Sequence, residues 1–360
     1  MKKILCIVFI VFTFVFCATQ SATSGILFEQ EIRIPALKFG GMFHIDDNFY
    51  FYSIEPTSKK QLLIYDNKVE LLKEISLKTI PYIDMCSGVD IFDFNRIALS
   101  IGSPLQIVYL IDSTAKIQGE NFVPQFVLVD SVKKIYRYVE TYKSFYDSVD
   151  NSILAYNIFF SQNSSTSAFD VKQLAEKYPL MLKIPFRNCE QIENIGENKL
   201  CDMYEEETDV YENGYCFVVG NYILYSYSKS LVTLVFDRKN NTFIKKIKST
   251  TKLLKPTKTK KNIQANHYPI YIMDICWNKV REEYYMLLVG DSDMIKDNNY
   301  ILQVFDKDFK YEREVKLPRV SGNDDYVYRM LSDGDRLVVK FSKNKSEDEF
   351  DYYNVYTINF

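Results

Sequence analysis

Five segments of the chain repeat one design, and this repeat restricts the fold more than any other sequence feature. In each segment a strand rich in aromatic or β-branched residues is followed by a polar turn and a second apolar strand, which in four of them ends in Asp. The paired runs are 48–53 with 61–66, 96–100 with 106–112, 222–227 with 231–237, 284–289 with 301–306, and 336–341 with 353–358. Such short runs, bounded by Asp, Asn, Ser and Lys, indicate antiparallel strand pairs.

The spacing of the strand ends predicts a β-propeller. The marks lie 46 to 74 residues apart along the chain, at Asp66, Asp112, Phe186, Asp237, Asp306 and Ile358. A solenoid would keep a tighter period, whereas four-stranded propeller blades of roughly 40 to 50 residues tolerate loop insertions. We therefore expect an all-β fold, a single β-propeller of four-stranded antiparallel blades. Six marks favour six blades, and seven is the alternative because the middle third is the least regular.

Two further segments complete this prediction. The strand at 26–34 has no partner in a blade of its own, so we expect it to complete the last blade beside residues 353–360 and to cover an open edge. A short helical insertion is expected near 167–178, where Val171, Leu174, Ala175 and Tyr178 share one face and Pro179 ends the helix. Residues 132–146 fit either a strand or a helix period.

The composition agrees with a folded all-β chain. The 360 residues include 54 Tyr and Phe (28 and 26), which favour strands, and only 2 His, which limits histidine-based metal sites and triads. A net charge of −3 argues against a broad nucleic-acid surface. The lysine-rich block at 245–261 lacks the interleaved aromatic residues of a nucleic-acid site, so no nucleic-acid partner is predicted.

The N-terminus has the pattern of a secretory signal. Lys2 and Lys3 precede an uncharged apolar stretch at 4–17, and small or polar residues follow it. We expect a signal peptide at 1–22 and the propeller domain at 23–360. The expected location is exported: the periplasm, the outer membrane or the cell surface. Two alternatives stay open, an uncleaved anchor and lipidation of Cys17, although Phe16 stands where lipoprotein signals carry a small residue.

The cysteines predict neither zinc nor redox chemistry. No two have the C-x-x-C spacing of a zinc ribbon or a catalytic dithiol. Cys216 and Cys276 lie in apolar runs and are expected to be core residues. Cys189 and Cys201 lie in a polar stretch and form the one candidate disulfide.

Part of the chain resembles a known family. The motifs are Tyr222–Ser228, Leu234–Asn241, His267–Ile270, Glu283–Tyr285 and Leu302–Lys310. Together they resemble an uncharacterised family of exported bacterial propellers with TolB-like architecture, a domain of unknown function. The resemblance extends over about residues 205–320, and the remainder follows the blade pattern only. It implies a six-bladed propeller and transfers no catalytic residue.

Few residues are candidates for a functional site. No phosphate-binding glycine loop or nucleophile elbow occurs. His44 and Asp46 could be read as metal ligands, but a turn before a strand is the better interpretation, so no metal and no cofactor are predicted. The ligand-binding candidates are His267 and Tyr268, in a loop that a propeller could place near its central channel, and Asp274, at a predicted inner strand.

Three functional hypotheses follow. The leading one is an exported, non-catalytic propeller that binds a protein, a peptide or a small ligand at its central face. The alternative is a carbohydrate-active, glycosidase-like enzyme that uses two carboxylates, roughly 5 to 10 Å apart in an open cleft. Its candidate residues are Asp84, Asp90, Asp93, Asp274 and Asp325. The third is a purely structural envelope component, which would show neither a pocket nor a response to ligands. Under each hypothesis, membrane contact is expected only if the N-terminus carries a lipid anchor.

Overall fold

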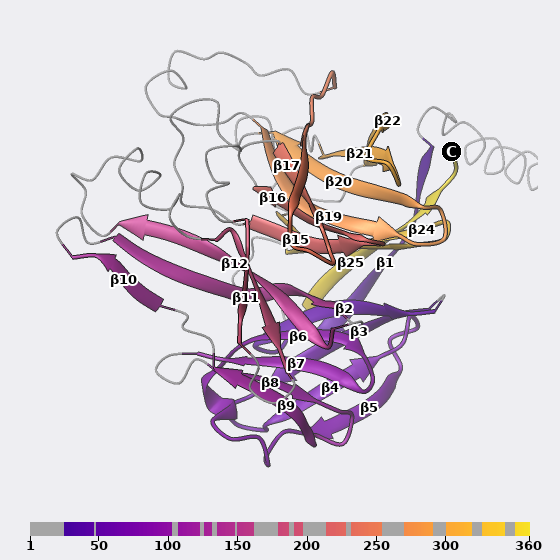
Figure 1. The fold of residues 1–360 in the computed structure, drawn as a ribbon. Coiled ribbons are helices and arrows are strands. Elements are labelled where there is room, and N and C mark those ends of the chain that lie inside the picture. Colours follow the sequence, from indigo (N-terminus) through magenta and orange to yellow (C-terminus); the bar gives the residue numbers. More distant parts are fainter. Residues whose placement is uncertain are drawn as a thin grey trace, which may run out of the picture.

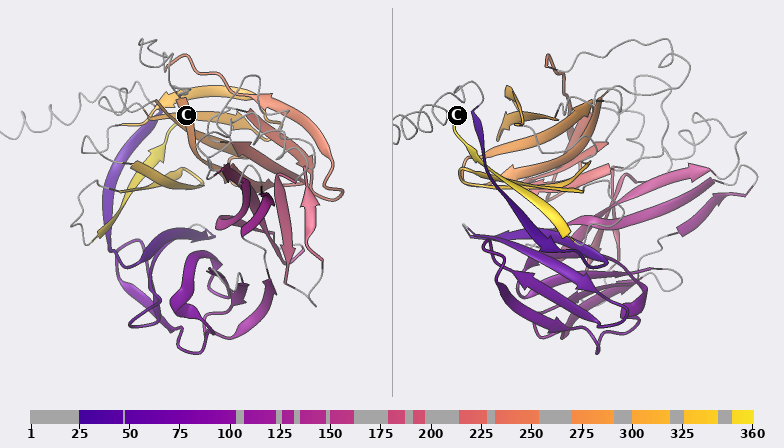
Figure 2. Two further views of the ribbon diagram at one scale, coloured as in Figure 1. Left: turned by 90° about the vertical axis from the view of Figure 1, so that its left-hand side faces the viewer. Right: turned by 180° about the vertical axis from the view of Figure 1, so that it is seen from behind.

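Six antiparallel sheets form a ring of blades (Figures 1 and 2), so the chain is an all-β, six-bladed β-propeller, as predicted. The computed structural model describes the following residues: 25–46, 48–102, 107–122, 126–131, 135–147, 150–161, 179–186, 191–196, 214–227, 232–253, 270–290, 300–318, 326–342 and 350–360.

Four of the blades are built from consecutive strands. The first has β2 (Phe39–Ile45), β3 (Asn48–Glu55), β4 (Gln61–Tyr65) and β5 (Leu71–Ser76). The second has β6 (Cys86–Asp93), β7 (Arg96–Ile101), β8 (Ile107–Ile111) and β9 (Ile117–Phe122). The fourth has β15 (Gly214–Val219), β16 (Tyr222–Tyr227), β17 (Val232–Asp237) and β18 (Phe243–Lys248). The fifth has β19 (Ile270–Asn278), β20 (Glu283–Gly290), β21 (Tyr300–Asp306) and β22 (Tyr311–Lys316).

The third blade carries one additional strand. It consists of β10 (Phe126–Asp130), β11 (Ile135–Asp147), β12 (Ser152–Ser161), β13 (Met181–Pro185) and β14 (Glu193–Ile195). Residues 135–146 of the segment that fitted either period therefore belong to the long strand β11. The predicted helix at 167–178 and the candidate pair Cys189 and Cys201 lie outside the described residues.

The sixth blade joins the two ends of the chain, as the sequence predicted. It consists of β23 (Tyr326–Asp333), β24 (Arg336–Ser342), β25 (Phe350–Ile358) and β1 (Ile26–Pro35). The sheet order is β1-β25-β24-β23, and Ile26 pairs with Ile358 at one end of the β1–β25 ladder. The outer edge of the last blade is thus supplied by the first strand of the chain.

The strand-end aspartates close a recurrent turn. Oδ1 of Asp66, Asp112 and Asp306 each accepts hydrogen bonds of 2.8–3.1 Å from the backbone N–H groups two and four residues later. Asp237 makes a similar turn that is one residue longer. These side chains stabilise hairpins between the third and fourth strands of four blades, because each carboxylate satisfies backbone donors that the ladder leaves unpaired.

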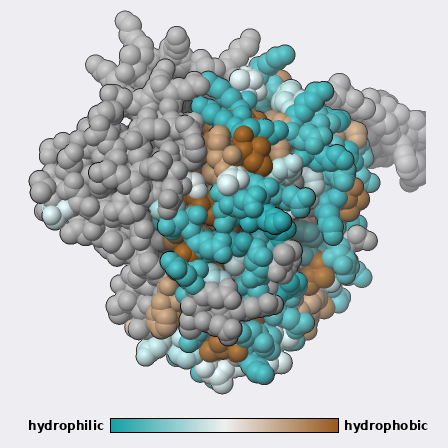
Figure 3. Space-filling model, in the orientation of Figure 1, coloured by the Kyte–Doolittle hydropathy of each residue, from teal (hydrophilic) through white to brown (hydrophobic). Residues whose placement is uncertain are grey.

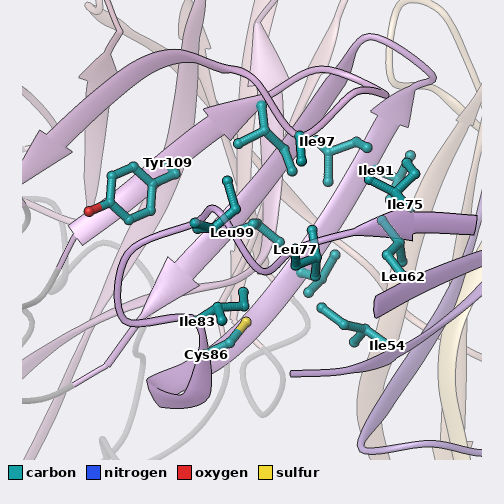
Figure 4. Packing of buried hydrophobic residues seen from close by; sticks show 14 of the residues in the cluster. Ile54, Leu62, Ile75, Leu77, Ile83, Cys86, Ile91, Ile97, Leu99 and Tyr109 are labelled. Carbon is teal, nitrogen blue, oxygen red and sulfur yellow. The ribbon is translucent and has the colours of Figure 1, made fainter. Parts of the chain in front are cut away.

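The cores lie between neighbouring blades. Figure 4 shows side chains from the first and second blades that meet in one cluster, among them Ile54, Leu62, Ile97 and Leu99, all fully buried. Burial of each such aliphatic side chain contributes roughly 1.5–3 kcal/mol. Cys86 joins this cluster, and Cys216 and Cys276 are buried free thiols, as predicted for the latter two.

Buried polar side chains also tie blades together. Asp147, which is fully buried at the end of β11, forms an ion pair with Arg238 of the fourth blade. Asn278, at the end of β19, donates hydrogen bonds to Ser332 Oγ (2.9 Å) and to the Gly334 carbonyl (2.8 Å) of the sixth blade. Its Oδ1 accepts the Arg281 N–H at 3.0 Å, which closes the turn between β19 and β20.

In the part of the chain that the structure describes, the only helical element is the 3₁₀ turn η1 (Ile83–Met85). No helix among these residues is long and apolar enough to cross a membrane.

Candidate functional site

The innermost strands of the blades bring polar residues together at the centre of the ring. These are β2, β6, β11, β15, β19 and β23, and each contacts the innermost strands of the two adjacent blades. Side chains that point inward from them converge although they are far apart in the sequence. Two such residues form the most distinctive charged pair of the described structure.

Asp90 of β6 and Arg329 of β23 form an ion pair between the second and sixth blades. Arg329 Nη1 donates to Asp90 Oδ1 at 2.8 Å. The Asp90 side chain is 2% exposed, whereas 21% of the Arg329 side chain remains accessible. A shift in the β23–β24 register between Val327 and Arg329 adds a local irregularity at this residue, and bulges of this kind re-aim side chains.

The environment keeps the guanidinium charged. Burial alone lowers the pKa of Arg329, but the nearby Asp90, Tyr52 and Asp274 outweigh it, so that the net pKa is raised. A guanidinium has five N–H donors in a fixed planar arrangement. Because part of the side chain is accessible beside its bond to Asp90, the group has the chemistry to bind a carboxylate, a phosphate or a carbonyl oxygen.

Asp274, one of the predicted ligand-binding residues, lies on β19 and is 7% exposed. Its Oδ2 accepts the backbone N–H of Met330 at 2.5 Å, which links the fifth blade to the sixth. It also lies close enough to Arg329 to favour the charged guanidinium. His267 and Tyr268, the other two candidates, lie outside the described residues.

The other two described candidate carboxylates, Asp84 and Asp93, lie near opposite ends of β6. Asp84 belongs to η1, ahead of β6, and is exposed. Asp93 ends β6 and pairs with Arg96 across the β6–β7 turn. Asp325 lies outside the described residues, as does the lipidation candidate Cys17.

Close packing next to the ion pair depends on glycines in β2. The Tyr52 hydroxyl donates to the Val89 carbonyl at 2.8 Å, adjacent to Asp90. A Cβ at Gly41 would overlap the Tyr52 ring, with its Cζ at 2.5 Å, so Gly41 allows the ring to lie against β2. Lys340 Nζ donates to the Gly40 carbonyl at 2.6 Å and pairs with Asp351 at 3.1 Å.

His44 and Trp277 are packing residues. His44 lies on β2 with its ring centroid 6.2 Å from that of Phe49, and Asp46 lies in the turn that follows β2. Trp277 packs, partly buried, against the cluster between the fourth and fifth blades. Within the described ranges, no three His, Cys, Asp or Glu side chains gather as a metal site.

Sequence reasoning missed Arg329. The predicted strand pair of the last blade began at residue 336, so β23 was not recognised as a strand. The available signal was a single charged side chain between Tyr328 and Met330 in an apolar run. A charge at such a position indicates a buried partner.

The ring of sheets and its charged centre define the class of protein, a six-bladed β-propeller. Comparison with known proteins adds no family: no protein-family model matches the chain, and no curated protein matches it.

Several solved structures are similar in fold at low sequence identity. A protein of unknown function from Bacteroides caccae aligns over 80% of this chain and 83% of its own, with 7% identity and a TM-score of 0.40. The β-propeller domain of Cps50 (Swd1) from Myceliophteria thermophila aligns over 92% and 99%, with 8% identity and a TM-score of 0.42. Hsv2p from Kluyveromyces lactis aligns over 86% and 72%, with 14% identity and a TM-score of 0.43.

Proposed function

We propose that this propeller is an exported binding protein that holds a protein, peptide or small ligand at its central face, through the Arg329 guanidinium. The observation that carries the proposal is the ion pair of Arg329 with the buried Asp90, which fixes the guanidinium while 21% of its side chain stays accessible. A preorganised donor of this kind binds acceptor groups without first losing conformational freedom. Asp274, which favours the charged guanidinium, remains a proposed ligand-binding residue, and so do His267 and Tyr268, on the sequence alone.

The described carboxylates favour binding over glycoside hydrolysis. A glycosidase needs one carboxylic acid and one carboxylate that are free to act on the substrate. The three described candidates on innermost strands are engaged in the fold: Asp90 holds Arg329, Asp93 holds Arg96 and Asp274 holds the Met330 N–H. The carbohydrate-active alternative therefore has no specific observation in its favour.

The export part of the proposal rests on the sequence. The basic, apolar and small-residue order of residues 1–22 and the resemblance to TolB-like exported propellers support it. Intact-mass analysis of protein from cell fractions tests export. A mature N-terminus after Ser21 or Ala22 in the exported fraction is expected, whereas full-length protein confined to the cytosol would contradict it. Radiolabelled palmitate incorporated by the chain but not by a Cys17→Ala variant would identify a lipid anchor.

A thermal-shift screen tests the binding function. The folded chain is heated with separate pools of peptides, oligosaccharides, nucleotides and divalent cations. A ligand at about 100 times its Kd adds about 2.7 kcal/mol to the free energy of unfolding and raises Tm by a few degrees. We expect a stabilising pool whose effect is lost in an Arg329→Lys variant, which keeps the charge but not the planar donors. A hit that this variant leaves unchanged places the ligand elsewhere and contradicts the proposal.

A further inference from the structure

A polar groove separate from the central channel lies at the junction of the second and third blades. It has a volume of about 420 Å³ and is lined by Asn95, Arg96, Leu110, Asp112, Gln118 and Asn151. This is within the range of roughly 300–1,000 Å³ typical of small-molecule sites. The lining comes from the β6–β7, β8–β9 and β11–β12 hairpins, from their turns and the adjoining strand residues, so two blades contribute to it.

Hydrogen bonds and an ion pair hold the Asp112, Gln118 and Arg96 side chains of this groove in place. Asp112 Oδ1 accepts the Thr114 N–H at 2.8 Å and the Lys116 N–H at 3.1 Å. Its Oδ2 accepts Gln118 Nε2 at 2.6 Å, which orients the amide plane. The hydrogen bonds that Asp112 accepts, above all the one from the Thr114 hydroxyl, lower its pKa to about 2. Asp112 is therefore ionised and accepts hydrogen bonds throughout the physiological pH range. Arg96 is held in turn by Asp93.

The Gln118 contact is particular to this blade. The same Asp turn occurs in two other blades. The residue six positions after the Asp is Leu72 in the first blade and Glu312 in the fifth. In the fourth blade, with its longer turn, the corresponding residue is Ile244. The turn therefore forms without a side-chain amide at this position. Stabilisation of the turn does not explain why the second blade has Gln118 there.

The mixture of groups selects the chemistry of a ligand. An anion would face Asp112 and a cation would face Arg96, whereas a neutral ligand with adjacent hydroxyl groups can donate to the carboxylate and accept from the guanidinium. The amides of Asn95, Gln118 and Asn151 add donors and acceptors, and Leu110, 3% exposed, supplies an apolar base. We propose that this groove binds a neutral saccharide through neighbouring hydroxyl groups.

Exposed apolar side chains are a weaker candidate for a docking surface. On the face shown in Figure 3, hydrophobic residues form small separate patches among hydrophilic ones. Nothing in the described structure indicates what would cover them.

Saturation-transfer NMR on the full chain tests the saccharide proposal, with glucose, mannose, galactose and maltose as the probes. We expect signal from at least one of them and a dissociation constant in the millimolar range, since the groove is open. A Gln118→Leu variant should bind that sugar about five-fold more weakly, the loss of about one net hydrogen bond. The matched Glu312→Leu variant changes the same turn position in the fifth blade and should bind like the unmodified chain.

The outcomes separate the two sites. Absence of saturation transfer from all four sugars, in protein shown to be folded by circular dichroism, overturns the proposal. The proposal is also overturned if Gln118→Leu and Glu312→Leu change the dissociation constant of the sugar equally. If Gln118→Leu fails to fold, Gln118→Glu, which keeps the size but places a second carboxylate beside Asp112, serves in its place. A sugar that binds by way of Arg329 instead would leave the Gln118 variant unaffected.

Discussion

Asp90 on β6 accepts a hydrogen bond at 2.8 Å from Arg329 on β23, a residue 239 positions further along the chain. The contact joins the second blade to the sixth through the middle of the ring. The first blade, which lies between them in the ring, provides Tyr52, whose hydroxyl binds the carbonyl next to Asp90. Three blades therefore depend on one buried group of contacts.

Replacement of Arg329 by Met is expected to destabilise the fold by about 3–5 kcal/mol, because Asp90 would remain buried without its charged partner. The double variant Asp90→Leu with Arg329→Met should recover most of that loss. Urea unfolding of the two variants and the unmodified chain gives the comparison. A double variant less stable than the single one would contradict the ion-pair explanation.

We expect the substitution Val69→Gly to raise the free energy of unfolding by about 1 kcal/mol. Val69 has a φ of 68°, in the left-handed region that β-branched residues avoid, and its side chain is 37% exposed. Phe309 is the matched position in the fifth blade, with a φ of 64°, but its ring packs against Tyr222 and Tyr284. Phe309→Gly should therefore lose about 3–5 kcal/mol. Thermal unfolding should show Tm moving in opposite directions.

Stability should fall as the pH drops from 7.5 to 5.5, partly because of His44. Burial lowers the pKa of this imidazole; Asp333 opposes the shift and Lys279 reinforces it. As the pH falls through about 6.5, the ordinary pKa of histidine, His44 takes up a proton in the unfolded chain but stays neutral in the folded chain. The free energy of unfolding therefore decreases as the pH falls. Urea titrations at both pH values should show a smaller decrease in a His44→Gln variant. An unchanged decrease would show that other groups cause it.

The buried thiols should react only after unfolding. Burial raises the pKa of Cys86 to about 11 and that of Cys216 to about 12, and it raises the pKa of Cys276 strongly. At pH 8 about one Cys86 side chain in a thousand is a thiolate, the form that reacts. Iodoacetamide labelling, mapped by peptide mass, should leave these three cysteines unmodified in the native chain and modify them in denaturant. Native labelling at the denatured rate would contradict the burial.

The sequence predicted the elements that depend on neighbouring residues. Strand pairs such as β3–β4 and the Asp66 turn follow from local alternation and from a side chain that binds backbone a few residues away. The innermost strands were harder to recognise, because β2, β6 and β23 include glycines or charged residues that break the apolar pattern. The partner of Asp90 could not be found from spacing, since only the closure of the ring brings Arg329 to it.

Left-handed backbone at Val69 and Phe309 was also unpredictable. Both residue types disfavour that conformation, and it is imposed by the Asp turns that precede them. The strand order of the last blade was predictable for the opposite reason: a lone strand at the start of the chain and an incomplete blade at its end require one another.

The pairing of β1 with β25 has a consequence for how the protein is made. The strand that completes the ring is synthesised about 330 residues before its partner, since Ile26 pairs with Ile358. At about 5–20 residues per second, β1 waits roughly 15–70 s before its ladder can form. During this interval Ile26, Ile32 and Ile34, which the folded chain buries, are available to chaperones or to other nascent chains, together with unpaired backbone groups. Folding of the propeller therefore requires that β1 stay unpaired and soluble until β25 has been synthesised.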